Sequence, residues 1–167
     1  MMQIYHGNTT EIAVPKLKTA ARHGDFGSGF YMYEEKDQAR LRAGLLARRE
    51  SLPYGIVSIF ETPIGLMNYS ALRIKKFKKP CIGWLDFILK NRRKPHMAHS
   101  YDIVSGPALD ENAYAFLNAF ESGFMERDEL IDVLKNSHLP NQILFHTAKS
   151  LLFLDFTGKE KVPCPKK

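Results

Sequence analysis

The sequence predicts an α+β fold in one domain. Segments with strand alternation and segments with helical spacing are mixed without the regular strand–helix order of a doubly wound fold. The length of 167 residues suits a single hydrophobic core, and no internal repeat or linker divides the chain. We expect one domain over residues 1–157, followed by a basic C-terminal tail over residues 158–167.

Several segments have the alternation of β-strands, and turn residues separate them. In the first segment, Ile4 and His6 share one face and Tyr5 takes the other. Pro63 and Gly65 mark a turn further along the chain. The expected strands are residues 3–6, a segment that starts at residue 30, and residues 56–61, 66–77, 101–105, 141–145 and 153–156.

Other segments have the spacing or capping residues of helices. Ala39 and Ala43 recur at helical spacing within a longer apolar stripe. Pro80 suits the first turn of a helix because its missing N–H would be unpaired there, and Asp110 can cap the next helix. The expected helices are residues 35–50, one that opens at residue 80, residues 111–124, a short one around 130–134, and a turn at 147–151.

The composition indicates a cytoplasmic protein. No apolar stretch is long enough to span a membrane, and the first residues lack the regions of a signal peptide. Cys81 and Cys164 are too few for a disulfide framework, which favours a reducing compartment. The 24 basic and 18 acidic residues give a net charge of +6, and such a charge attracts anions, including nucleic acid.

Common catalytic and metal motifs find little support in the sequence. The segment Gly27-Ser28-Gly29 lacks the third glycine of a dinucleotide loop, and a strand is expected after it instead of a helix. His96 and His99 have no glutamate between them and no neighbouring cysteine, so we expect no metal site there. Neither cysteine lies in a nucleophile motif.

Three short segments resemble the three motifs of the ADP-ribosyltransferase superfamily. They are Tyr5-His6-Gly7, Gly27-Ser28-Gly29-Phe30-Tyr31 and Asn141-Gln142-Ile143-Leu144-Phe145. In the diphtheria-toxin and poly(ADP-ribose)-polymerase branch of that superfamily, a His, a Tyr and a Glu line the NAD cleft. More closely, the chain resembles a small, mostly bacterial family within the superfamily that is known as a domain of unknown function. Longer matches to this family, such as residues 101–107, extend the resemblance over residues 4–156.

The resemblance implies two packed antiparallel β-sheets around an NAD cleft, with flanking helices. It implies that NAD is a substrate, and that ADP-ribose passes from nicotinamide to a protein or nucleic-acid acceptor. The catalytic residues would be His6, Tyr31 and Gln142, and the NAD-binding residues would be His6, Gly7, Asn8, Gly29, Phe30 and Tyr31. Members of the smaller family are often encoded beside small partner genes, which implies the toxin of a toxin–antitoxin pair with a small antitoxin protein as its partner.

Each implied site residue has a role that its chemistry suits. His6 would bond the adenosine ribose hydroxyls, because a neutral imidazole offers one donor and one acceptor. The main chain of Gly7 would hold the nicotinamide carboxamide. Tyr31 would stack on the nicotinamide ring, and Tyr33 is a candidate for the second aromatic contact.

Gln142 departs from the superfamily pattern, which has Glu at this position. Glutamine keeps a hydrogen bond to the ribose 2′-OH but supplies no charge for the oxocarbenium-like transition state. The protein could therefore be a slower mono-transferase, could use a carboxylate from elsewhere or from its target, or could bind NAD without turnover. The basic clusters support a different class, a nucleic-acid-binding or ribonuclease-like protein.

Overall fold

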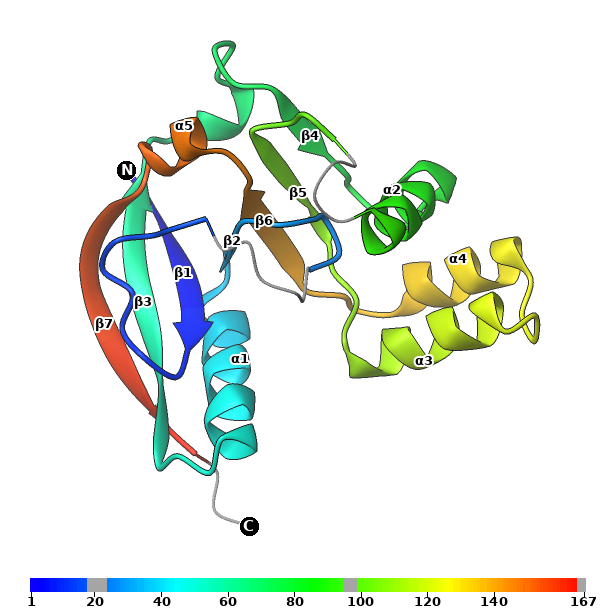
Figure 1. Cartoon of the computed structure of the whole chain (residues 1–167), viewed down its shortest axis with the longest axis horizontal. Coiled ribbons are helices and arrows are strands. Elements are labelled where there is room, and N and C mark those ends of the chain that lie inside the picture. Colours follow the sequence, from blue (N-terminus) through cyan, green and yellow to red (C-terminus); the bar gives the residue numbers. More distant parts are fainter. Residues whose placement is uncertain (18–23, 95–98, 165–167) are drawn as a thin grey trace.

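The computed structural model describes residues 1–17, 24–94 and 99–164 and has the predicted α+β class. Within these residues, seven strands form one mixed sheet in the order β4-β5-β6-β2-β1-β3-β7, and helices pack beside it (Figure 1). The strands are β1 (Met2–Asn8), β2 (Phe30–Tyr33), β3 (Tyr54–Thr62), β4 (Ile74–Lys76), β5 (Ile103–Pro107), β6 (Asn141–Phe145) and β7 (Asp155–Pro163).

The helices follow the predicted order, and most begin within two residues of the expected position. They are α1 (Lys36–Arg49), α2 (Ile82–Arg93), α3 (Glu111–Glu121), α4 (Arg127–Asn136) and α5 (Ala148–Leu151). The predicted cap of α3 is confirmed, because the Asp110 side chain accepts a hydrogen bond from the Ala113 N–H at 2.8 Å. None of the helices in the described ranges combines the length and apolar character needed to cross a membrane.

A single residue pair joins the two halves of the sheet. Tyr5 of β1 pairs with Tyr33 of β2, whereas β1 pairs with β3 along its whole length. This pair links the group β4-β5-β6-β2 to the group β1-β3-β7, so the described strands form one sheet where we predicted two. β4 runs parallel to β5, and the other pairs are antiparallel, so the sheet is mixed.

Helices α1 to α4 share one face of this sheet. Buried side chains of α2, α3 and α4 pack on Val104 of β5 and Leu144 of β6. Ala39 and Ala43 of α1 pack with Val57 of β3 on the same face, toward the other end. The opposite face buries a separate cluster of side chains from β1, β2, β3, β6 and the loops near η1 (Leu66–Asn68) and α5. Figure 1 shows α1 apart from the group of α2, α3 and α4.

Gly7 lets α1 approach the sheet closely. A Cβ built on Gly7 would lie 2.1 Å from the Ala39 carbonyl oxygen of α1, a distance no side chain can accept. Gly7 therefore has a packing role besides the ligand role implied by the motif. A Cβ built on Gly44 of the same helix would have no atom within 4 Å, so Gly44 is free of this constraint.

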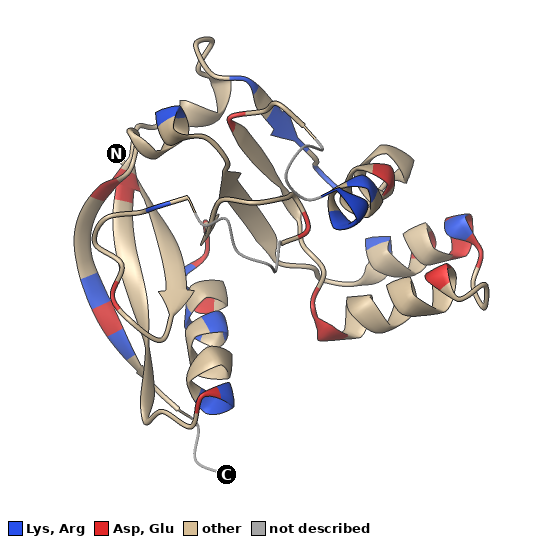
Figure 2. Ribbon diagram, viewed as in Figure 1, with Lys and Arg blue, Asp and Glu red and all other residues tan. Residues whose placement is uncertain are grey.

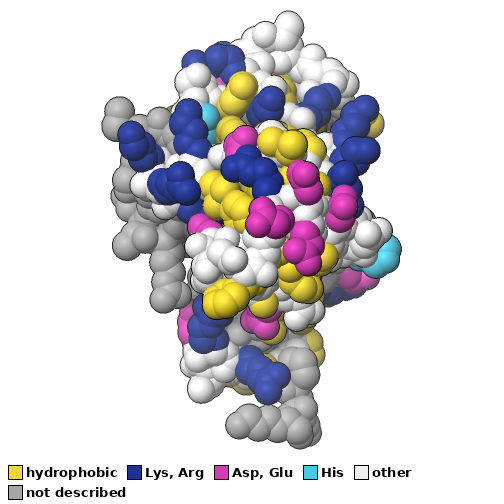
Figure 3. All heavy atoms as spheres, turned by 90° about the vertical axis from the view of Figure 1, so that its right-hand side faces the viewer, with side chains coloured by type: hydrophobic (Ala, Val, Ile, Leu, Met, Phe, Trp, Pro, Cys, Tyr) yellow, Lys and Arg dark blue, Asp and Glu magenta, His cyan; other side chains and the backbone are white. Residues whose placement is uncertain are grey.

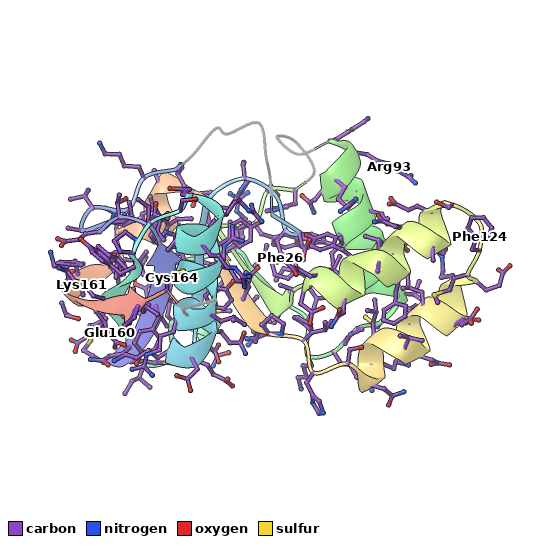
Figure 4. All side chains as sticks on the ribbon, turned by 90° about the horizontal axis from the view of Figure 1, so that it is seen from below. Phe26, Arg93, Phe124, Glu160, Lys161 and Cys164 are labelled. Atoms are coloured by element: carbon purple, nitrogen blue, oxygen red, sulfur yellow. The ribbon has the colours of Figure 1, made fainter. Side chains whose placement is uncertain are left out.

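The C-terminal tail predicted over residues 158–167 is a strand through most of its length. β7 pairs with β3 from Asp155 to Pro163, with a register shift near Ile59 and Phe60. Its Glu160 accepts a bond from Arg40 of α1 at 2.7 Å, so charge pairing holds the strand to the helix. Figure 4 shows Glu160 on β7 beside α1. The prediction missed this strand because its basic residues suggested a solvated tail; residues 165–167 lie outside the described residues.

The segment 66–77 also differs from the prediction of one strand. It begins with the 3-10 helix η1 and reaches β-structure only in β4. Gly65 precedes η1 in the left-handed conformation, with φ of 85°. The two strands expected at residues 101–105 and 153–156 extend to Pro107 and Pro163.

We expect Gly7→Ala to destabilise the protein by about 1–3 kcal/mol or more, because the new methyl group overlaps the α1 backbone. Gly44→Ala is the matched control in α1 and should stabilise by about 0.5–1 kcal/mol, the usual gain in a helix interior. Urea unfolding of both variants measures the difference. Equal stability of the two variants would show that the contact between β1 and α1 is less close than described.

Candidate functional site

The ring of Tyr31 closes over the glycine loop, which is residues 24–29 and leads into β2. The Tyr31 hydroxyl donates to the Gly27 carbonyl oxygen at 2.5 Å and accepts from the Phe26 N–H at 3.1 Å. A Cβ on Gly24 would lie 2.3 Å from the Tyr31 ring, so glycine is needed for this close approach. Tyr31 therefore fixes the loop that precedes it, and its half-buried ring packs beside the core of the helical face.

Two histidines bind the carbonyl groups on either side of the one that Tyr31 binds. His99 Nε2 lies 2.7 Å from the Phe26 carbonyl oxygen, and His146 Nδ1 lies 2.6 Å from the Ser28 carbonyl oxygen. A carbonyl oxygen only accepts, so each of these nitrogens carries a proton. The two imidazole rings are 4.3 Å apart between centroids. Three side chains thus donate to three successive carbonyl groups of the glycine loop.

Asp25 anchors the start of the same loop to α3. Its carboxylate accepts from the Leu109 N–H at 2.7 Å and from the Tyr114 hydroxyl at 2.6 Å. Burial raises the pKa of Asp25, and these two hydrogen bonds and Arg92 act against that rise. Phe26, the next residue, is fully buried among the side chains of α2 and β6 (Figure 4). Contacts to its main chain and contacts of its side chains therefore both hold the loop in place.

Gln142 meets Tyr33 across β6 and β2. The two residues are paired in register, and Gln142 Nε2 donates to the Tyr33 hydroxyl at 2.6 Å. Burial raises the pKa of Tyr33, the bond from Gln142 lowers it, and the nearby charges of Arg42 and Asp25 act in opposite directions. By strand alternation Tyr31 lies on this same face, so the structure brings Tyr31, Tyr33 and Gln142 together.

His6 lies on the other face of the sheet. Its ring stacks on Phe30 with centroids 4.3 Å apart, and Phe30 is buried in the cluster opposite the helices. His6 Nδ1 donates to the Tyr31 carbonyl oxygen at 2.7 Å, so His6 contacts the main chain of Tyr31 and not its ring. The three predicted catalytic side chains therefore come from neighbouring strands but do not share one face.

The remaining predicted NAD-binding residues have contacts within the protein. Gly7 is buried under α1, and the Asn8 side chain accepts from the Thr9 N–H at 2.9 Å. A Cβ on Gly29 would lie 2.4 Å from the Phe145 carbonyl oxygen, so this glycine lets β2 start beside β6. Of these residues, Asn8 and Gly29 are half-buried.

Sequence reasoning missed the residues that hold the glycine loop. In the sequence, His99 is considered only together with His96, as a metal site that we do not expect. His96 lies outside the described residues. Asp25 precedes the glycine segment without an assigned role, and His146 and Tyr114 belong to no motif. A signal was available for Asp25 alone, since a charged residue at the head of a glycine-rich segment needs a partner when buried.

Comparison with known families gives one match. The model of the family described as "Protein of unknown function (DUF3990)" matches residues 2–156, which is most of the chain. Neither the curated proteins nor the solved structures contain a match to this chain. The family match confirms the narrower resemblance found in the sequence, while the link to the ADP-ribosyltransferase superfamily stays a prediction.

We expect Tyr31→Phe to lower the free energy of unfolding by about 1–3 kcal/mol, because it leaves the Gly27 carbonyl and the Phe26 N–H without their partner. Tyr69→Phe, at a side chain that is 49% exposed, is the control and should change stability by less than about 0.5 kcal/mol. Urea unfolding compares the two. If Tyr31→Phe unfolds at the same urea concentration as the wild type, the hydrogen bonds of the Tyr31 hydroxyl do not stabilise the loop.

Acid should destabilise the glycine loop through His99. Burial lowers the pKa of His99 below its usual 6.5, and the charges of His146 and Lys90 add to this, while the bond to Phe26 opposes it. The folded state binds the His99 proton more weakly than the unfolded state does. The contribution of His99 to folding stability is therefore present above about pH 6.5 and is lost as the pH falls through the folded pKa.

The free energy of unfolding is measured at a series of pH values around the usual histidine pKa. The fall in stability on acidification should be smaller in His99→Gln than in the wild type. His138→Gln, at an exposed histidine, should follow the wild-type curve. If His99→Gln loses as much stability on acidification as the wild type does, the pH dependence of stability comes from other groups.

Proposed function

The chain belongs to the DUF3990 family, and we propose that it is an NAD-dependent mono-ADP-ribosyltransferase. The proposal includes the fold of that superfamily, a cytoplasmic location and the role of toxin in a bacterial toxin–antitoxin pair. Both cysteines are free thiols, which agrees with a reducing compartment. NAD would be consumed, and a protein or nucleic acid would accept ADP-ribose.

The observation that carries the proposal is the meeting of three distant sequence segments. The motif strands β1, β2 and β6 lie side by side in the order β6-β2-β1. Gln142 on β6 contacts Tyr33 on β2, and His6 on β1 contacts the main chain of Tyr31. Motif resemblance alone selects these segments, with more than 100 positions between the first and the last. Such a convergence is typical of a site built from separate strands.

The narrow link between β1 and β2 supports an entry point for NAD. These strands share the pair Tyr5 and Tyr33, and no further pair is formed toward Gly7 and Tyr31 in the described strands. A ligand at this point would reach main-chain groups of β1 from one side and the Tyr31 ring from the other. The resemblance implies two packed antiparallel sheets around an NAD cleft, and the single pair that joins the two groups of strands is the feature nearest to that arrangement.

In the proposed reaction, the bond between nicotinamide and ribose breaks and nicotinamide leaves with the bonding electrons. The acceptor oxygen or nitrogen forms the new bond to the ribose carbon and loses its proton. Gln142 would bond the ribose 2′-OH, oriented by its contact with Tyr33. His6 would act as a positioning residue, because its bond to the Tyr31 carbonyl sets where β2 lies beside β1.

Asp25 is a candidate source of the negative charge that Gln142 lacks. Its carboxylate is buried behind the glycine loop and bonds Tyr114. Asp25 lies beside the site, because the N–H of its neighbour Phe26 donates to the Tyr31 hydroxyl at 3.1 Å. Burial is the main cause of the raised pKa of Tyr31, and the charge of Asp25 adds to that rise. Such a charge would act at longer range than the superfamily glutamate, which is consistent with a slow enzyme.

The test is incubation of the protein with labelled NAD and a cell lysate. We expect nicotinamide release and label on protein or nucleic acid. Gln142→Glu should raise the rate of nicotinamide release about 10²–10³-fold, because it restores a charged contact to the transition state. Asn118→Asp adds the same charge at an exposed position of α3, outside the motif strands, and should leave the rate unchanged.

The outcomes separate the remaining function classes. NAD binding without nicotinamide release in either protein would indicate an inactive binding domain. RNA cleavage in the absence of NAD would support the ribonuclease-like alternative. A rate that rises equally in Gln142→Glu and Asn118→Asp would contradict the role of Gln142.

A further inference from the structure

Two basic segments that are separate in the sequence lie beside one row of aromatic rings. Lys75 of β4 places its ammonium 5.2 Å from the centroid of the Phe77 ring. Phe77 lies 5.3 Å from Phe87 of α2, and Phe87 lies 5.1 Å from His99, between ring centroids. Lys90 is three residues from Phe87 on α2 and lies on the same side of that helix. Basic side chains from two segments therefore lie beside one row of three rings.

These rings are not fully enclosed. Phe77, Phe87 and His99 are each half-buried beside the core of the helical face. Phe87 and Lys90 are three residues apart on α2, so they lie on one side of that helix. An incoming planar group could therefore contact ring surface while its charged part meets the lysine.

Lys90 also lines a pocket at the end of α2. The pocket holds a volume of about 260 Å³ and is lined by Asp86, Leu89, Lys90, Arg93, Lys94 and Arg127. Asp86, the acidic residue of this set, is paired with Arg127 at 2.6 Å. Among the ion pairs of the described ranges, none involves Lys75, Lys90, Arg93 or Lys94. These cations remain available to a ligand.

The figures agree with this placement. Figure 2 shows basic residues along β4 and at the end of α2, on the same side of the molecule. Figure 3, which views that side, shows Lys and Arg side chains gathered over its upper part, and Figure 4 shows Arg93 projecting from α2. The opposite end of this face, near α3 and α4, carries more acidic side chains.

Cations at the C-terminus of a helix also favour the helix dipole, and this explains part of the cluster. The dipole effect acts only within the last turn, whereas Lys75 lies on a strand. It also gives no reason for the row of half-exposed rings beside the two basic segments. Basic groups that track a backbone, with aromatic rings on which bases stack, are the combination found in sites for single-stranded nucleic acid.

We propose that Lys75, Phe77, Phe87, His99, Lys90 and Arg93 form a binding site for single-stranded nucleic acid. Phosphates contact the two basic segments, and bases stack along the aromatic row. His99 also bonds the Phe26 carbonyl, so the site adjoins the glycine loop. The role of the bound strand as the ADP-ribose acceptor rests on the proposed function, whereas binding itself does not.

The experiment measures anisotropy of a fluorescent 20-nucleotide single strand without NAD, at salt concentrations around 0.1 M. Lys90→Gln with Arg93→Gln should weaken binding about tenfold and reduce the slope of log K against log salt by about 1.4, since each phosphate contact contributes about 0.7. The matched control is Arg48→Gln with Arg49→Gln, which removes the same charge from the last turn of α1.

Three results would overturn the proposal. Equal weakening by the two double variants would assign binding to net charge alone. Tighter binding of the duplex of the same sequence, or equal displacement by polyglutamate, would point to another kind of partner. Because NAD is absent, a strand that binds normally while no nicotinamide is released in the NAD assay would contradict the transferase and leave this site standing.

Discussion

The glycine loop is the constraint on which the site depends. A run of carbonyl groups in a buried turn costs free energy unless each finds a donor, and here the donors come from three separate parts of the chain. Tyr31 supplies one from the next strand, His99 one from the segment before β5, and His146 one from the end of β6. The carbonyl groups of the loop are therefore all paired only where β2, the segment before β5 and the end of β6 lie together.

This dependence links the two faces of the sheet. The Tyr31 side chain holds the loop on the helical face, while the Tyr31 carbonyl receives the His6 ring from the other face. These two contacts lie next to the point where the pairing of β1 and β2 ends. Tyr31 therefore connects the packing of the loop to the placement of β2 beside β1.

The local patterns predicted most of the fold. Alternation and helical spacing located β6 and α1 almost to the residue, because their apolar residues face a core in the usual way. Charge misled the prediction of β7, where Glu160 is satisfied by α1 rather than by solvent. The joining of two strand groups by Tyr5 and Tyr33 could not be predicted, since no local pattern states which strands pair.

The site was predictable as a set of segments but not as a geometry. Motif resemblance selected β1, β2 and β6, which are neighbours, yet alternation alone assigns His6 and Gly7 to opposite faces and cannot say which face meets Tyr31. The structure answers this through register. It also gives Gln142 a defined hydrogen-bond partner in Tyr33, which orients the amide toward one direction. Because the amide nitrogen donates to the phenol, the position of the Gln142 side chain is set by its neighbour on β2 and not by its own strand alone.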